Sequence, residues 1–114
     1  MARGKKTEEK KELDYIEYDI NGANGNDMEG RVYKEPHIVE GKGSWHGMSF
    51  TFNGLSVKGC KLWIPVDEKK AVCILWPSYE DKEKKKQSYI AFFKKEDRED
   101  VANLCEHLAG QLGY

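Results

Sequence analysis

The chain has 114 residues and a formal net charge of −1, with 34% charged and 39% hydrophobic residues. This size fits one small domain with a modest core. Its apolar runs are far shorter than the about 20 residues that cross a bilayer, and its Lys- and Glu-rich start lacks the apolar segment of a secretory signal. We therefore expect no membrane partner and a cytoplasmic location.

The charges are segregated along the chain. Residues 12–29 carry six acids and no basic residue, whereas residues 58–95 carry ten lysines against five acids. Residues 96–114 are acidic again, with five acids against one arginine. A near-neutral total therefore hides a basic region that can attract phosphates.

The first part of the chain predicts a tail and a hairpin. Residues 1–12 have no apolar anchor, so we expect a disordered charged tail there, followed by a single α+β domain over residues 13–114. Aromatic and β-branched residues favour a strand over 13–20, and two Asn-Gly pairs then predict a hairpin turn or a longer loop. Residues 31–39 are predicted to form a weak edge strand interrupted at Pro36.

The middle of the chain has the clearest strand pattern. Met48, Phe50 and Phe52 alternate with polar residues, which is typical of a half-buried strand. Further along, the apolar positions change phase at Gly59. A one-residue shift at a glycine predicts a β-bulge.

The last third predicts two strands and a helix. Residues 71–76 are apolar in both phases, which predicts a central strand with both faces covered, ended by Pro77. A long charged loop is predicted over 78–87 and another strand over 88–93. An apolar stripe at helical spacing predicts an amphipathic helix from about residue 95 to 112.

Together these elements predict an α+β fold: a bent antiparallel sheet of about five strands with one C-terminal helix packed on one face.

Catalytic and metal motifs are missing from the sequence. Cys60, Cys73 and Cys105 are widely spaced in apolar patterns, which is typical of buried reduced thiols rather than of a zinc site. His46 beside Ser44 is the only local group that resembles a catalytic one, and neighbours in sequence do not make a triad. We expect no catalytic residues, no metal and no cofactor, and hence no enzyme.

The order of the later elements resembles the SpoVG (septation protein) family of small bacterial DNA-binding regulators. Residues 72–78 resemble the family's apolar strand ending in Met-Pro-Ser, residues 55–63 its alternating strand, and Arg98 with the following apolar stripe the start of its helix. The resemblance covers about residues 48–110. It implies a small sheet with one helix, dimerisation through strand pairing, and DNA binding without a strict code.

The basic region supplies the candidate site. Clustered lysines bind phosphates, and exposed aromatic rings stack on the bases of single strands. The candidate nucleic-acid-binding residues are Lys58, Lys61, Trp63, Tyr79, Lys82, Lys84, Lys85, Lys86, Lys94 and Lys95. We expect a non-catalytic protein, such as a regulator, that binds single- or double-stranded DNA as a homodimer.

A second hypothesis stays open: a small phage or mobile-element protein that binds and inhibits another protein. The acids of residues 12–29 can mimic nucleic-acid phosphates and occupy a basic groove. The two hypotheses differ in the charged surface that they need. Neutralising the lysines at 82–86 would disable a nucleic-acid binder, and neutralising Glu12, Asp14, Glu17 and Asp19 would disable a mimic.

Overall fold

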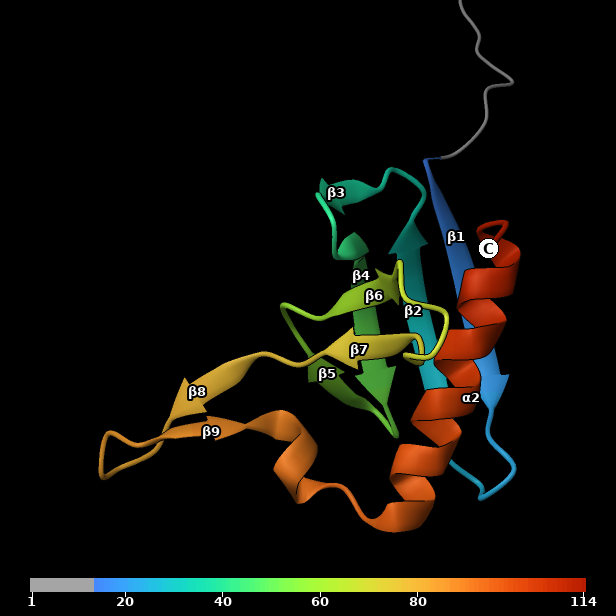
Figure 1. Cartoon of the computed structure of the whole chain (residues 1–114). Coiled ribbons are helices and arrows are strands. Elements are labelled where there is room, and N and C mark those ends of the chain that lie inside the picture. Colours follow the sequence, from blue (N-terminus) through green and yellow to red (C-terminus); the bar gives the residue numbers. More distant parts are fainter. Residues whose placement is uncertain (1–13) are drawn as a thin grey trace, which may run out of the picture.

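A computed structural model describes residues 14–114, so the predicted tail at residues 1–12 lies outside the described part. The elements are β1 (Tyr15–Asn21), β2 (Asp27–Tyr33), β3 (His37–Val39), β4 (Gly43–Phe52), β5 (Leu55–Val57), β6 (Lys61–Pro65), β7 (Cys73–Leu75), β8 (Ser78–Glu80), β9 (Lys86–Ser88), the 3-10 helix η1 (Tyr89–Phe92) and the helix α2 (Lys95–Gln111). The fold is α+β, with α2 packed against an antiparallel sheet, as predicted (Figure 1).

Seven strands form one sheet, and its main path is β1-β2-β4-β6-β7. The short strands β3 and β5 join it by pairing with the long strand β4. In Figure 1, β6 and β7 run at a steep angle to β2, so the sheet is strongly bent. The main path has five strands, the number predicted, although the predicted strand at 88–93 is not among them. No helix among residues 14–114 has the length and apolar character to cross a membrane.

The predicted bulge at Gly59 is confirmed. On β4 the paired positions Phe50 and Gly47 are three residues apart, while their partners Val57 and Lys61 are four residues apart. The extra residue lies between β5 and β6, where Gly59 has φ +84°. This left-handed conformation suits glycine, which has no Cβ to clash with the backbone.

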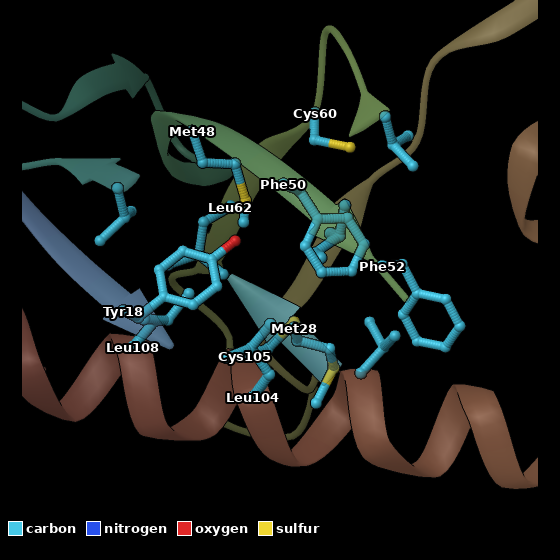
Figure 2. Packing of buried hydrophobic residues seen from close by; sticks show 14 of the residues in the cluster. Tyr18, Met28, Met48, Phe50, Phe52, Cys60, Leu62, Leu104, Cys105 and Leu108 are labelled. Atoms are coloured by element: carbon cyan, nitrogen blue, oxygen red, sulfur yellow. The ribbon is translucent and has the colours of Figure 1, made fainter. Parts of the chain in front are cut away.

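One cluster of buried side chains joins the sheet to α2. Figure 2 shows Leu104 and Leu108 of α2 pointing toward Met28, Met48 and Phe50 of the sheet. Leu108 has no exposed surface, and Leu104 is 2% exposed. The helical stripe read from the sequence is therefore the face that packs on the sheet.

The prediction that residues 71–76 form a central strand is wrong. The segment forms the short edge strand β7, which in the described part of the chain pairs with β6 alone. Ile74 is buried, but Cys73 and Leu75 are exposed. The residues are apolar in both phases, yet α2 covers only one side of the sheet, so the second phase faces outward. Cys73 therefore also contradicts the prediction of a buried thiol, whereas Cys60 and Cys105 are buried.

The predicted loop at 78–87 and strand at 88–93 are also wrong. The first segment is the hairpin β8–β9, because the carboxylate of Asp81 accepts hydrogen bonds from turn amides and orders it. The second forms η1. Tyr89 packs on Tyr79 of the hairpin, while Phe93 packs on Phe52 and Trp76. A strand would place Tyr89 and Phe93 on the same face, which does not fit their packing on different parts of the molecule.

The predicted strand at 31–39 is two strands. Arg31 to Tyr33 end β2, which lies between β1 and β4 and is not an edge strand, whereas His37–Val39 is β3. Pro36 lies in the break, as expected for a residue without a backbone donor.

Candidate functional site

The sheet has an outer surface on the side away from α2. It is formed by the residues that alternate with the buried ones. On β6, for example, Lys61, Trp63 and Pro65 alternate with the buried Leu62 and Ile64. The cross-strand register then assigns every paired residue to the same surface as its partner.

A row of four directly paired residues crosses one half of this outer surface. His37 pairs with Trp45, Trp45 with Trp63, and Trp63 with Cys73, from β3 through β4 and β6 to β7. We call these four residues the aromatic row. Three spacings of about 4.8 Å make it roughly 14 Å long.

The indole of Trp45 is held between two neighbours. The His37 ring stacks on it with the centroids 3.9 Å apart and the planes 8° from parallel. The ammonium nitrogen of Lys61 lies 4.3 Å from the Trp45 ring centroid. His37 and Lys61 belong to strands on opposite edges of β4, so the ring has a partner from each side. The cation–π contact holds the Lys61 charge on the outer surface.

Trp63 lies against the backbone of β4. A Cβ added to Gly43 would come within 2.9 Å of Trp63 Cζ2, so the absence of a side chain at Gly43 makes room for the indole. Trp63 is nevertheless only half-buried. Since the sheet covers one side of the ring, its accessible part faces away from the protein.

The hairpin lysines lie on an element that projects from the sheet (Figure 1). They are exposed, but the segment from Ser78 to Ser88 contains four lysines and three acids. Glu80 is the direct cross-strand partner of Lys86. Hydrogen bonds from the Lys85 amide, the Gln87 side chain and the Glu83 amide hold the pKa of Asp81 below its usual value. The Asp81 carboxylate is therefore ionised at neutral pH. The hairpin thus presents little net positive charge.

The other predicted residues lie elsewhere. Lys58 is exposed beside the bulge at Gly59. Lys94 and Lys95 are at the start of α2, where the Lys94 amide donates to the Asp97 carboxylate over 3.2 Å. Tyr79 is half-buried, with its ring centroid 5.3 Å from that of Tyr89. The structure therefore brings Lys61 and Trp63 together and places the remaining predicted residues on separate elements.

Sequence reasoning missed Trp45 and His37 as members of this site. Trp45 carried a usable signal, because it shares the polar phase of β4 with Gly47 and Ser49, opposite to Met48. A tryptophan in the polar phase of a strand is placed on the outer surface. His37 carried no such signal, since its position depends on the pairing of β3 with β4.

The other half of the outer surface is acidic. The side chains of Glu17 and Asp19 on β1 share it with those of their β2 partners Arg31 and Glu29. A groove of about 500 Å³ runs among these residues. Arg31 Nε lies 3.9 Å from Glu17 Oε2, so the groove's one arginine is already close to a carboxylate. Of the acids predicted for mimicry, Glu12 lies outside the described residues.

His46 is part of the fold. It is 1% exposed, with Nδ1 2.7 Å from the Tyr33 carbonyl oxygen and Nε2 2.8 Å from the Tyr114 hydroxyl. Because a carbonyl only accepts, Nδ1 donates the first bond, and in the neutral ring Nε2 accepts the second. Burial also raises the pKa of Cys60 and Cys105 to about 12, so both thiols are protonated at neutral pH.

No family model, curated protein or solved structure matches the chain. The resemblance to the SpoVG family, and the homodimer that it implies, therefore remain predictions. The outer surface itself is therefore the basis on which a function can be proposed.

Proposed function

We propose that the chain is a non-catalytic nucleic-acid-binding protein. The observation that carries the proposal is the group formed by Lys61, Trp45 and Trp63: an ammonium held over one indole beside a second, half-buried indole. This group offers the two interactions that nucleic acids require, attraction of phosphates and stacking on bases.

The hairpin β8–β9 adds further lysines to the site in this proposal, although its net charge is small. Its exposed lysines can follow the sugar–phosphate backbone beyond the aromatic row. In this proposal the protein acts as a regulator in the cytoplasm. The homodimer belongs to the same proposal, since β7 is an edge strand and such strands can pair with a second copy.

Fluorescence anisotropy of labelled oligonucleotides tests the proposal at about 50 and 200 mM salt, a range over which phosphate contacts weaken strongly. We expect binding at the lower salt that weakens at the higher one. A variant with Lys82, Lys84, Lys85 and Lys86 changed to Gln should bind more weakly. Absence of binding at the lower salt, or unchanged binding by this variant, would contradict the proposal.

The matched control neutralises acids instead, with Glu17→Gln and Asp19→Asn on the acidic half. It should bind nucleic acid as well as the parent protein or better, because two repulsive charges are removed.

The acidic groove favours a second candidate function, inhibition of another protein through a basic surface. Carboxylates of β1 and β2 line the groove and can pair with lysines or arginines of a partner. The same two variants separate the candidates. In a pull-down with the parent chain as bait, a partner lost with the acid variant and kept with the lysine variant would favour inhibition.

A further inference from the structure

We infer that the ligand is single-stranded nucleic acid and that Trp63 is the residue on which its bases stack. This inference depends on the proposed function and adds the class of ligand to it. It also assigns different roles to the two indoles of the aromatic row.

Of these indoles, Trp63 is the one that can receive a base. The ring of Trp45 has His37 stacked at 3.9 Å and the Lys61 ammonium 4.3 Å from its centroid. Both indoles are half-buried, but Trp63 lies against Gly43 of β4 and has neither of these two partners on its ring. A base that stacks on Trp63 must have a free face, and in a duplex both faces of an internal base are covered by its neighbours. The geometry therefore favours an unpaired strand.

Lys61 is placed to contact the phosphate next to such a base. Lys61 and Trp63 are two residues apart on β6, and their side chains lie on the same surface. Two residues of a strand span about 7 Å, which is within the size of one nucleotide unit. The contact with Trp45 holds the ammonium there before the ligand arrives, which lowers the entropy lost on binding.

The distribution of charge disfavours a duplex. A duplex binder typically neutralises about 6–10 phosphates with lysines and arginines. Here the four hairpin lysines share their segment with three acids, and Lys94 and Lys95 precede Glu96 and Asp97. The acidic half of the outer surface adds repulsion. Residues 14–114 therefore lack a continuous basic stripe of the length that a duplex requires.

The test compares a labelled single strand of about 20 nucleotides with the duplex of the same sequence at about 50 mM salt. We expect the parent protein to bind the single strand at least about tenfold more tightly. Trp63→Leu should lower that affinity about 5- to 150-fold, the range for losing one stacked base. The matched control is Tyr15→Leu, a half-buried aromatic residue on the acidic half, which should change affinity less than about twofold.

A second variant covers the possibility that Trp63→Leu disturbs β6. Trp63→Phe keeps an aromatic ring over Gly43 but removes the indole, so quenching of tryptophan fluorescence by oligothymidine should be largely lost while binding is retained. Unchanged quenching in this variant would overturn the role of Trp63.

The outcomes separate the inference from the function on which it depends. Binding of neither nucleic acid would overturn both. Equal affinity for the duplex and the single strand, together with unchanged binding by Trp63→Leu, would leave the proposed function standing and overturn the inference.

Discussion

The hairpins β1–β2 and β8–β9 both have loops held by Asn or Asp side chains, but the bonds reach different parts of the molecule. In the β1–β2 loop, the side-chain amides of Asn24 and Asn26 donate to the carboxylate of Asp100 on α2. In β8–β9, the carboxylate of Asp81 accepts hydrogen bonds within its own turn. The first loop is therefore tied to the core, whereas the second is ordered locally and can open without unfolding the protein.

The Asp100 contacts form a network that joins three segments. Asp100 is 1% exposed, and Asn26 donates to it over 2.8 Å. Asn26 in turn accepts a hydrogen bond of 2.9 Å from Asn53, in the turn between β4 and β5. Gly22 lies so close that a Cβ there would collide with the Asp100 carboxylate. Helix, hairpin loop and turn are thus held by one buried carboxylate.

The largest effect is expected for Asp100→Ala. It leaves the buried amide of Asn26 without its acceptor and should lower the free energy of unfolding by about 3 kcal/mol. The measurement is the urea midpoint at pH 7. The matched control is Asp97→Ala, which removes a capping contact at the start of the same helix and should cost about 1 kcal/mol. Equal losses in the two variants would show that the network adds nothing beyond helix capping.

Acidification should act through the same network. Burial raises the pKa of Asp100, but the hydrogen bonds from Asn26 and Asn24 outweigh it and hold the pKa below its usual value. Since the folded-state pKa is depressed, this stabilisation is present above the unfolded pKa of about 3.9 and is lost as the pH falls through the folded-state value. Urea midpoints should therefore fall below about pH 4. The fall should be smaller in Asp100→Asn, and an identical fall would assign it to other groups.

Asp81→Ala should act only on the hairpin. The variant removes the acceptor for the amides of Glu83 and Lys85, so amides in β8 and β9 should exchange faster with solvent. The urea midpoint should stay within error of the parent, because no core contact is lost. A midpoint as low as that of Asp100→Ala would contradict the contrast between the hairpins.

The smallest expected effect is a local stabilisation of the hairpin β8–β9 by Lys84→Gly. Lys84 has φ +62° in the hairpin turn, a conformation that costs a non-glycine residue about 1 kcal/mol. Glycine should therefore slow amide exchange in β8–β9 by a corresponding factor. Lys85→Gly removes a neighbouring charge at a position without positive φ and should give no gain.

The sequence predicted the features that depend on local pattern. The phase of β6 and the bulge at Gly59 indicated that Lys61 and Trp63 belong to the same surface, and the apolar stripe indicated the face of α2. The position of β7 could not be predicted, because apolar residues in both phases fit either a central strand or an edge strand. Burial of Asp100 was also hidden, since its partner Asn24 lies 76 residues away along the chain.

The bulge at Gly59 determines which side chains of β6 meet a ligand. Val57 before it and Leu62 after it both face the core, although they are an odd number of residues apart. If the same number of residues alternated strictly here, without the bulge, Lys61 and Trp63 would turn inward and Leu62 and Ile64 outward. The left-handed turn at Gly59 absorbs the extra residue, so the backbone conformation at this one position decides which face of β6 is presented to a ligand.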